Sequence, residues 1–187
     1  TLLYRNSGIA QSVNTINATL LTYVSLSFGT PVVASLLWWC SVVAIALGRY
    51  WLSRRFARIN PIGYAMHQWR HKYLVGTCLA GVGWGSGAFL YMWHTTDTSQ
   101  LFTALVMAGM VAGAVPALAP VPLIFRTYAL LLLVPTACII LLQADTPFHW
   151  AFGGMTLVFL GAVMASARFL HEILDSSIRL ALEQRRL

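Results

Sequence analysis

Six long apolar runs divide the chain, and short polar stretches separate them. The runs cover about residues 8–28, 32–52, 73–93, 100–118, 123–142 and 148–167. Each run is close to the roughly 20 residues that an α-helix needs to cross a bilayer. The pattern predicts an all-α fold in which residues 1–169 form one six-helix transmembrane bundle.

The basic residues fall only in alternate gaps between these runs. All twelve Lys and Arg lie in or beside those gaps or in the two terminal segments, whereas the other gaps hold only Asp97 and Asp145 as formal charges. Residues 53–72, with the turn Asn60-Pro61-Ile62-Gly63, are expected to form one basic loop. Because Lys and Arg collect on the cytoplasmic flanks of membrane helices, both termini are predicted to be cytoplasmic.

The composition supports a lipid bilayer as the main partner. Hydrophobic residues make up 58% of the chain and charged residues 9%, whereas soluble domains carry about 25% charged residues. The formal net charge of +7 would suit nucleic acid in a soluble protein. Here the charge flanks apolar runs, so anionic headgroups are the expected contact and no nucleic acid is expected.

The last segment, residues 170–187, has an amphipathic pattern. Leu170, Leu174, Ile178 and Ala181 repeat at intervals of four, four and three. We expect a cytoplasmic signalling helix that pairs with its copy in a homodimer and leads to an output domain further along a longer protein. The alternative is a helix that lies on the headgroups with the same apolar side.

Glycines at four-residue spacing occur in the third and fourth runs. Gly81 and Gly85 form one such pair, Gly83 and Gly87 form a second, and Gly109 and Gly113 form a third. Small residues at this spacing let two membrane helices approach closely. The third and fourth runs are therefore expected to pack against each other through these glycines.

A candidate ligand site lies near the middle of the third run. Trp84 is far from the interface where tryptophan usually resides, so its indole N–H needs a partner such as Ser86 or a polar residue of the first run. The first run carries a stripe of hydroxyls and a strip of amides at Gln11, Asn14 and Asn17, and Asn14 and Asn17 should turn toward other helices. The candidate residues for a small hydrophobic ligand or lipid are Trp84, Ser86, Asn14, Asn17 and Thr19. The alternative is ordinary packing around Trp84.

Metal binding and catalysis have weaker support. His94, Asp97, Asp145 and His149 lie in or beside the two acidic loops and include ligand types that accept a metal ion, although solvated loop residues are the simpler interpretation. No His lies mid-span to ligate haem, and no catalytic triad or phosphate-binding loop occurs. We expect no cofactor and no enzyme activity in this chain.

Several motifs together resemble a known family. They are Leu3-Tyr4-Arg5-Asn6, Trp69-Arg70, Trp84-Gly85, the segment 108–114 (Ala-Gly-Met-Val-Ala-Gly-Ala) and Pro135. The chain resembles the MASE-type N-terminal integral-membrane sensory domains of bacterial signalling proteins. The resemblance implies a six-span input domain in the bacterial inner membrane. It also implies a cytoplasmic output, usually a GGDEF diguanylate cyclase that makes c-di-GMP, or a histidine kinase.

Two other functions fit the same composition. One is a small membrane transporter or channel subunit whose path is lined by the polar faces of the first run. The other is a metal-binding membrane module that uses the outer His and Asp residues. Neither inverted repeats nor a pair of broken helices, which many transporters contain, is visible in the sequence.

Overall fold

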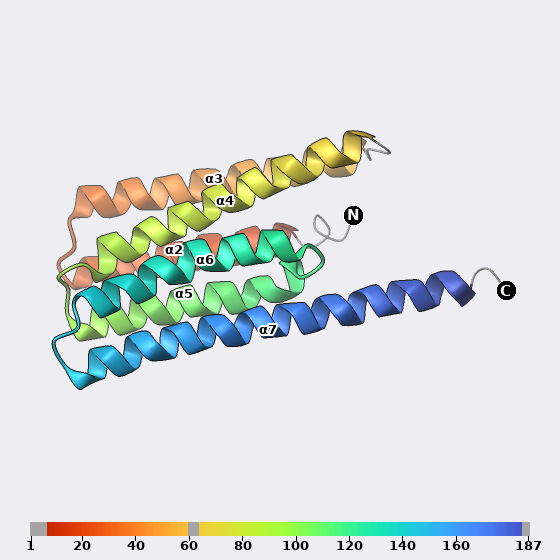
Figure 1. Cartoon of the computed structure of the whole chain (residues 1–187). Helices are drawn as coiled ribbons and strands as arrows, with labels where there is room; N and C mark the ends of the chain where they lie inside the picture. Colours follow the sequence, from red (N-terminus) through yellow and green to blue (C-terminus); the bar gives the residue numbers. More distant parts are fainter. Residues whose placement is uncertain (1–6, 60–63, 185–187) are drawn as a thin grey trace.

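The chain folds into long helices joined by short turns (Figure 1). A computed structural model describes residues 7–59 and 64–184, without the side chains of residues 7, 9, 64–67 and 178–184. The described residues form α2 (Ser7–Ser27), α3 (Val32–Ile59), α4 (Tyr64–Met92), α5 (Asp97–Leu118), α6 (Pro122–Leu142) and α7 (Pro147–Gln184). They contain no strand, which confirms the all-α class. Residues 3–6 of the family resemblance, and the side chains of Ile178 and Ala181, lie outside the described part.

Five of these helices are long and apolar enough to cross a membrane. The qualifying segments cover residues 32–59, 68–92, 97–118, 122–142 and 147–177. The first helix, α2, is not among them, because its amides and hydroxyls lower its hydropathy. Large apolar side chains cover the outside of the bundle: Val33, Leu105 and Val158 are each at least 70% exposed. This surface is typical of a multi-pass membrane protein, since hydrocarbon takes the place of water around it.

The predicted basic loop over residues 53–72 is mostly helical, which corrects the expectation. α3 continues to Ile59 and α4 begins at Tyr64, so both helices extend past their apolar runs. Arg, Ala, Gln and Lys in these extensions are good helix formers. The buried rings of Phe56 and Trp69 also hold the two extensions together, with centroids 5.5 Å apart.

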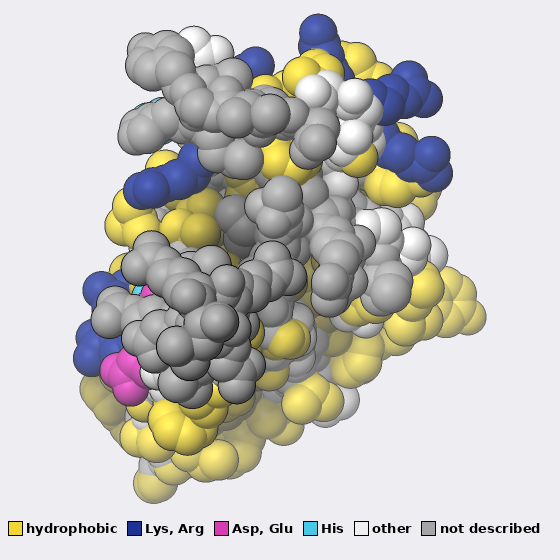
Figure 2. Space-filling model, turned by 90° about the vertical axis from the view of Figure 1, so that its right-hand side faces the viewer, with side chains coloured by type: hydrophobic (Ala, Val, Ile, Leu, Met, Phe, Trp, Pro, Cys, Tyr) yellow, Lys and Arg dark blue, Asp and Glu magenta, His cyan; other side chains and the backbone are white. Residues whose placement is uncertain are grey.

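Basic side chains gather toward one end of the bundle. This end, shown in Figure 2, also carries acidic side chains, and it holds the described Lys and Arg residues. They are Arg49, Arg54, Arg55, Arg58, Arg70, Lys72, Arg126 and Arg168. Asp97 and Asp145 lie at the opposite end, where α5 and α7 begin (Figure 1).

The closest backbone approach involves α4 and α6. A Cβ added to Gly85 would overlap the carbonyl oxygen of Leu131, and one added to Gly81 would lie 2.9 Å from the Leu131 Cβ. Pro135 follows Leu131 by four residues and has no N–H, so the Leu131 carbonyl lacks its usual helical donor. Gly85 therefore presents its Cα to a carbonyl that α6 leaves free, a geometry suited to a weak Cα–H···O contact.

The other glycines of α4 face α3, not α5. The Trp38 indole donates a 2.7 Å hydrogen bond to the Gly83 carbonyl. A Cβ on Gly87 would come within 2.7 Å of the Trp38 ring. The prediction that α4 and α5 pack through their glycines is wrong: the two helices do touch, but Gly109 and Gly113 have no atom within 4 Å of an added Cβ. Small residues permit a close approach, but they do not determine which helix makes it.

We predict that Gly85→Ala destabilises the bundle, because the new methyl group would force α4 away from α6 at Leu131. The expected loss in the free energy of unfolding is about 1–3 kcal/mol, as for other overpacked positions. Thermal unfolding of the detergent-solubilised protein measures it. The matched control is Gly161→Ala, where an added Cβ meets nothing within 4 Å. Equal stability of the two variants would contradict the packing described for Gly85.

Candidate functional site

A cavity of about 320 Å³ lies among five of the helices. α2 and α5 form its sides, and single residues of α3, α4 and α6 reach it from behind. Ligand pockets in proteins usually measure about 300–1,000 Å³, so this one suits a small ligand or part of a larger one.

The mouth of the cavity opens between α2 and α5. Val13 on α2 and Gly109, Gly113 and Pro116 on α5 line the cavity and are exposed on the bundle surface. Because the two glycines have no side chains, α5 leaves this gap unfilled. Gly109 and Gly113, predicted as packing residues, therefore form part of the cavity wall.

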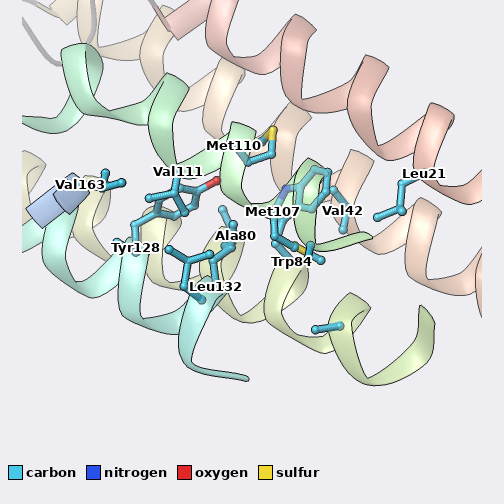
Figure 3. Packing of buried hydrophobic residues seen from close by; sticks show 14 of the residues in the cluster. Leu21, Val42, Ala80, Trp84, Met107, Met110, Val111, Tyr128, Leu132 and Val163 are labelled. Carbon is cyan, nitrogen blue, oxygen red and sulfur yellow. The ribbon is translucent and has the colours of Figure 1, made fainter. Parts of the chain in front are cut away.

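The inner wall holds a hydrogen bond between α2 and α4. The Trp84 indole Nε1 donates to the Asn14 Oδ1 at 2.6 Å. Trp84 is fully buried and packs edge-on against Trp38, with ring centroids 5.5 Å apart. Figure 3 shows Trp84 among the buried residues of the core, beside Val42 and Met107. The prediction that a polar residue of the first run would satisfy the Trp84 N–H is confirmed.

Gln11 lies one helical turn before Asn14 and also lines the cavity. Its residue is only 8% exposed, and its side-chain Oε1 has no hydrogen-bond partner. Buried polar atoms without a partner are uncommon in folded proteins and call for an explanation such as a bound water, ion or ligand. Gln11 Oε1 shares this property with Gln100 Oε1 and Thr103 Oγ1 among the described residues, and of the three residues Gln11 lines the cavity.

Arg49 brings a positive charge to the same wall. Its Nη2 donates a 3.3 Å hydrogen bond to the Thr77 hydroxyl, and its guanidinium lies 5.6 Å from the centre of the Tyr73 ring. Within the part of the chain that the structure describes, no Asp or Glu is ion-paired with Arg49; the pair found there joins His149 and Asp97. A cation that is partly withdrawn from solvent is stabilised by a bound anion.

Tyr128 closes the cavity from α6. It is buried, and Figure 3 shows its hydroxyl directed toward Met110, which also lines the cavity. The cavity thus combines apolar walls with an amide, a guanidinium and phenol groups. This combination can bind a molecule that has a polar end and an apolar body.

The predicted ligand residues separate into two groups. Asn14 lines the cavity and accepts from Trp84, which lies behind it, and the Asn17 amide contacts the sulfur of Met110 at 3.2 Å. Ser86 is exposed and donates to the Gly83 carbonyl, whereas Thr19 is exposed and accepts from the Trp39 indole. Neither Ser86 nor Thr19 lines the cavity.

Sequence reasoning missed the four other lining residues with polar side-chain groups: Gln11, Arg49, Tyr73 and Tyr128. Gln11 carried a usable signal, since it lies three residues before Asn14 and shares its helix face. Arg49 carried another, because it precedes Arg54 by five residues and so lies more than one turn inside the basic end of α3.

The predicted metal residues do not form a complete ligand set. The His149 Nε2 lies 3.3 Å from the Asp97 Oδ1, and its Nδ1 lies 2.9 Å from the Thr146 hydroxyl. His94 instead uses its backbone N–H, which donates to the Gln143 side chain. Among the described residues, no group of three or more His, Cys, Asp or Glu could hold a metal ion. The His149–Asp97 pair connects the start of α7 to the start of α5.

Comparisons with protein families, with curated proteins and with solved structures found no match to this chain. The resemblance to MASE-type sensory domains therefore stays a prediction that depends on the motifs quoted above.

We predict that Asn14→Leu destabilises the protein by about 1–3 kcal/mol, because it leaves the buried Trp84 N–H without an acceptor. Trp84→Phe in the same background should recover part of the loss, since it removes the orphaned donor. Chemical or thermal unfolding in detergent measures both effects. Ser12→Ala is the control, because that hydroxyl is exposed and bonds only to the Gly8 carbonyl of its own helix. A loss of stability that is the same with Phe as with Trp at position 84 would argue against the hydrogen bond.

Proposed function

We propose that the chain is the membrane sensory and dimerisation module of a bacterial signal-transduction protein. In this proposal six helices cross the inner membrane, and both termini are cytoplasmic. A ligand or lipid signal passes through α7 to a cytoplasmic output domain. By the family resemblance, that output is a diguanylate cyclase or a histidine kinase.

The observation that carries the proposal is the length of α7. This helix continues without a break through 38 residues, or about 57 Å at 1.5 Å per residue. A bilayer core needs only about 30 Å. α7 therefore extends beyond α5 and α6 at the end of the bundle where the basic side chains gather (Figure 1). A stiff helix of this kind is a suitable connection between a membrane bundle and a domain outside it.

The projecting part of α7 has an apolar side that a second subunit can cover. Leu170 and Leu174 are half-buried, and their neighbours Phe169 and Ile173 are 66% and 44% exposed. Phe169 and Ile173 are four residues apart, as are Leu170 and Leu174, and the two pairs are adjacent. All four residues therefore lie on one side of the helix. Glu172 lies between them in sequence, Asp175 follows Leu174, and both acids are exposed. This arrangement supports pairing over binding to anionic headgroups, which repel the acids.

The cavity is placed where its contents can affect α7. Its α5 wall packs against α7 as well as against α2, and α6, which supplies Tyr128, packs against α7 along its membrane part. A ligand that prefers one arrangement of α2 and α5 would therefore bias the position of α7. Shifting a two-state dimer in this way needs a few kcal/mol of differential binding energy.

We predict that single cysteines placed at residues 169–181 form disulfides between subunits with a helical period. The expected maxima are at or next to positions 170, 174, 178 and 181, with at least about fivefold lower yield on the opposite face, because only one side of a paired helix meets its copy. The native Cys40, Cys78 and Cys138 are first replaced by Ser, and crosslinking is measured in membranes containing the full-length protein.

Cysteine at position 105 is the control for random collision, since Leu105 is 70% exposed on α5 and is not part of α7. A yield along α7 that shows no helical period, or that equals the Leu105 control, would remove the support for a paired signalling helix.

A further inference from the structure

We infer that the cavity binds a single-chain anionic amphiphile. Its carboxylate or phosphate oxygen contacts Arg49, and its acyl chain passes over the α5 glycines and out between α2 and α5. This inference names the ligand class of the proposed sensory site, and its role in signalling rests on that proposed function. The inference that a ligand binds depends only on the cavity and its lining residues.

The polar end of the cavity matches an anionic oxygen group. Arg49 has five N–H donors, and Thr77 accepts from its Nη2. Tyr128 can add an O–H donor from α6. The unpaired Gln11 amide also suits an anion, because turning it by 180° exchanges its oxygen for its NH₂ group. Polar groups from three helices, α2, α3 and α6, thus line the same cavity.

Arg49 differs from the other arginines of α3. The Arg54 guanidinium lies 5.1 Å from the ring centre of half-buried Tyr50, and the Arg55 guanidinium lies 5.3 Å from that of Trp51; both of these arginines are exposed. Such pairs are typical of a headgroup belt. Arg49 is half-buried and lines the cavity. It is therefore the arginine placed to hold a headgroup inside the bundle.

The apolar end of the cavity matches one hydrocarbon chain. Val13 and Met110 supply apolar side chains, and Gly109 and Gly113 leave a smooth wall between them. The volume of about 320 Å³ lies at the lower end for ligand pockets. It suits one headgroup with the first part of one chain, and the exposed mouth lets the rest of the chain continue into the bilayer.

A photoaffinity experiment tests the proposal. The protein is reconstituted into phosphatidylcholine nanodiscs and irradiated with palmitate that carries a diazirine in its chain. Labelled residues are then mapped by mass spectrometry. We expect labelling at residues 10–14 and 109–117, and competition by unlabelled palmitate. Phosphatidylglycerol, which has two acyl chains, is then added to the nanodiscs. Weaker competition by this lipid than by palmitate is expected, and competition by phosphatidylglycerol without competition by palmitate would contradict a single-chain ligand.

Two matched pairs of variants identify the site. Arg49→Leu should lower the labelling about tenfold or more, because a charged hydrogen bond contributes at least that factor. Arg126→Leu, an exposed arginine of the same end, should leave it within about twofold. Gly113→Leu should block the mouth, whereas Gly161→Leu on open surface should not. The size-exclusion profile of each variant checks that it is folded. If Arg49→Leu does not fold, Arg49→Lys is used instead: it keeps the positive charge but has fewer N–H donors.

Two outcomes would overturn the proposal. One is labelling of residues 10–14 and 109–117 that does not exceed labelling of the exposed residues Val33, Leu36 and Leu37. The other is labelling that stays the same in Arg49→Leu and Gly113→Leu. If palmitate binds at the cavity but leaves the crosslinks along α7 unchanged, the ligand class stands and the sensory function is contradicted.

Discussion

The close approach of α4 to α6 at Gly85 determines how the other helices are placed. α4 packs against α3, α5 and α6, while α6 packs against α4, α5 and α7, so these two helices form the centre of the bundle. Trp84 precedes Gly85 by one residue and therefore points about 100° away from it around the helix. With Gly85 against the Leu131 carbonyl, Trp84 is directed at Asn14 of α2. Pro135 contributes by leaving that carbonyl without a helical donor. Pro135 on α6 and Gly85 on α4 thus set the position of the Trp84 indole, which donates its hydrogen bond to α2.

The polar residues of α2 show how such a helix fits into an apolar bundle. Ser12, Thr15 and Thr19 donate to carbonyls of their own helix, which satisfies a hydroxyl without a neighbour. Amides cannot do this as readily, and Asn14 and Asn17 bond to α4 and α5 instead. Gln11 is the exception, since its oxygen has no protein partner. An amide, a guanidinium and a phenol line one open volume, and this arrangement supports the proposal that a ligand completes these contacts.

The sequence predicts the parts of this fold that depend on local composition. Helix positions, the separation of charge and the inward direction of Asn14 all follow from apolar length and from the cost of unpaired amides. The partners of the glycines do not follow, because Gly81 and Gly85 contact Leu131, which is distant in the chain. Ser86 was assigned to the Trp84 site on proximity in sequence, yet a residue two positions along a helix lies on another face. Arg49 resembles the other arginines of its segment until the arrangement of five helices encloses it.

The small residues Gly109 and Gly113 of α5 form part of the cavity wall and do not pack closely against another helix. Gly109 and Gly113 have no side chains to pack against α2, so this part of the α2–α5 interface depends on contacts such as that of Asn17 with Met110. At its basic end α5 is tied to α6 by the short connection from Leu118 to Pro122, and α6 packs against α7. Within the proposed function, a ligand that binds one rotation of α5 tenfold more tightly supplies about 1.4 kcal/mol. That amount changes a 1:3 equilibrium to about 10:3, which is enough to reverse the favoured position of α7 if its two packings are nearly equal in free energy.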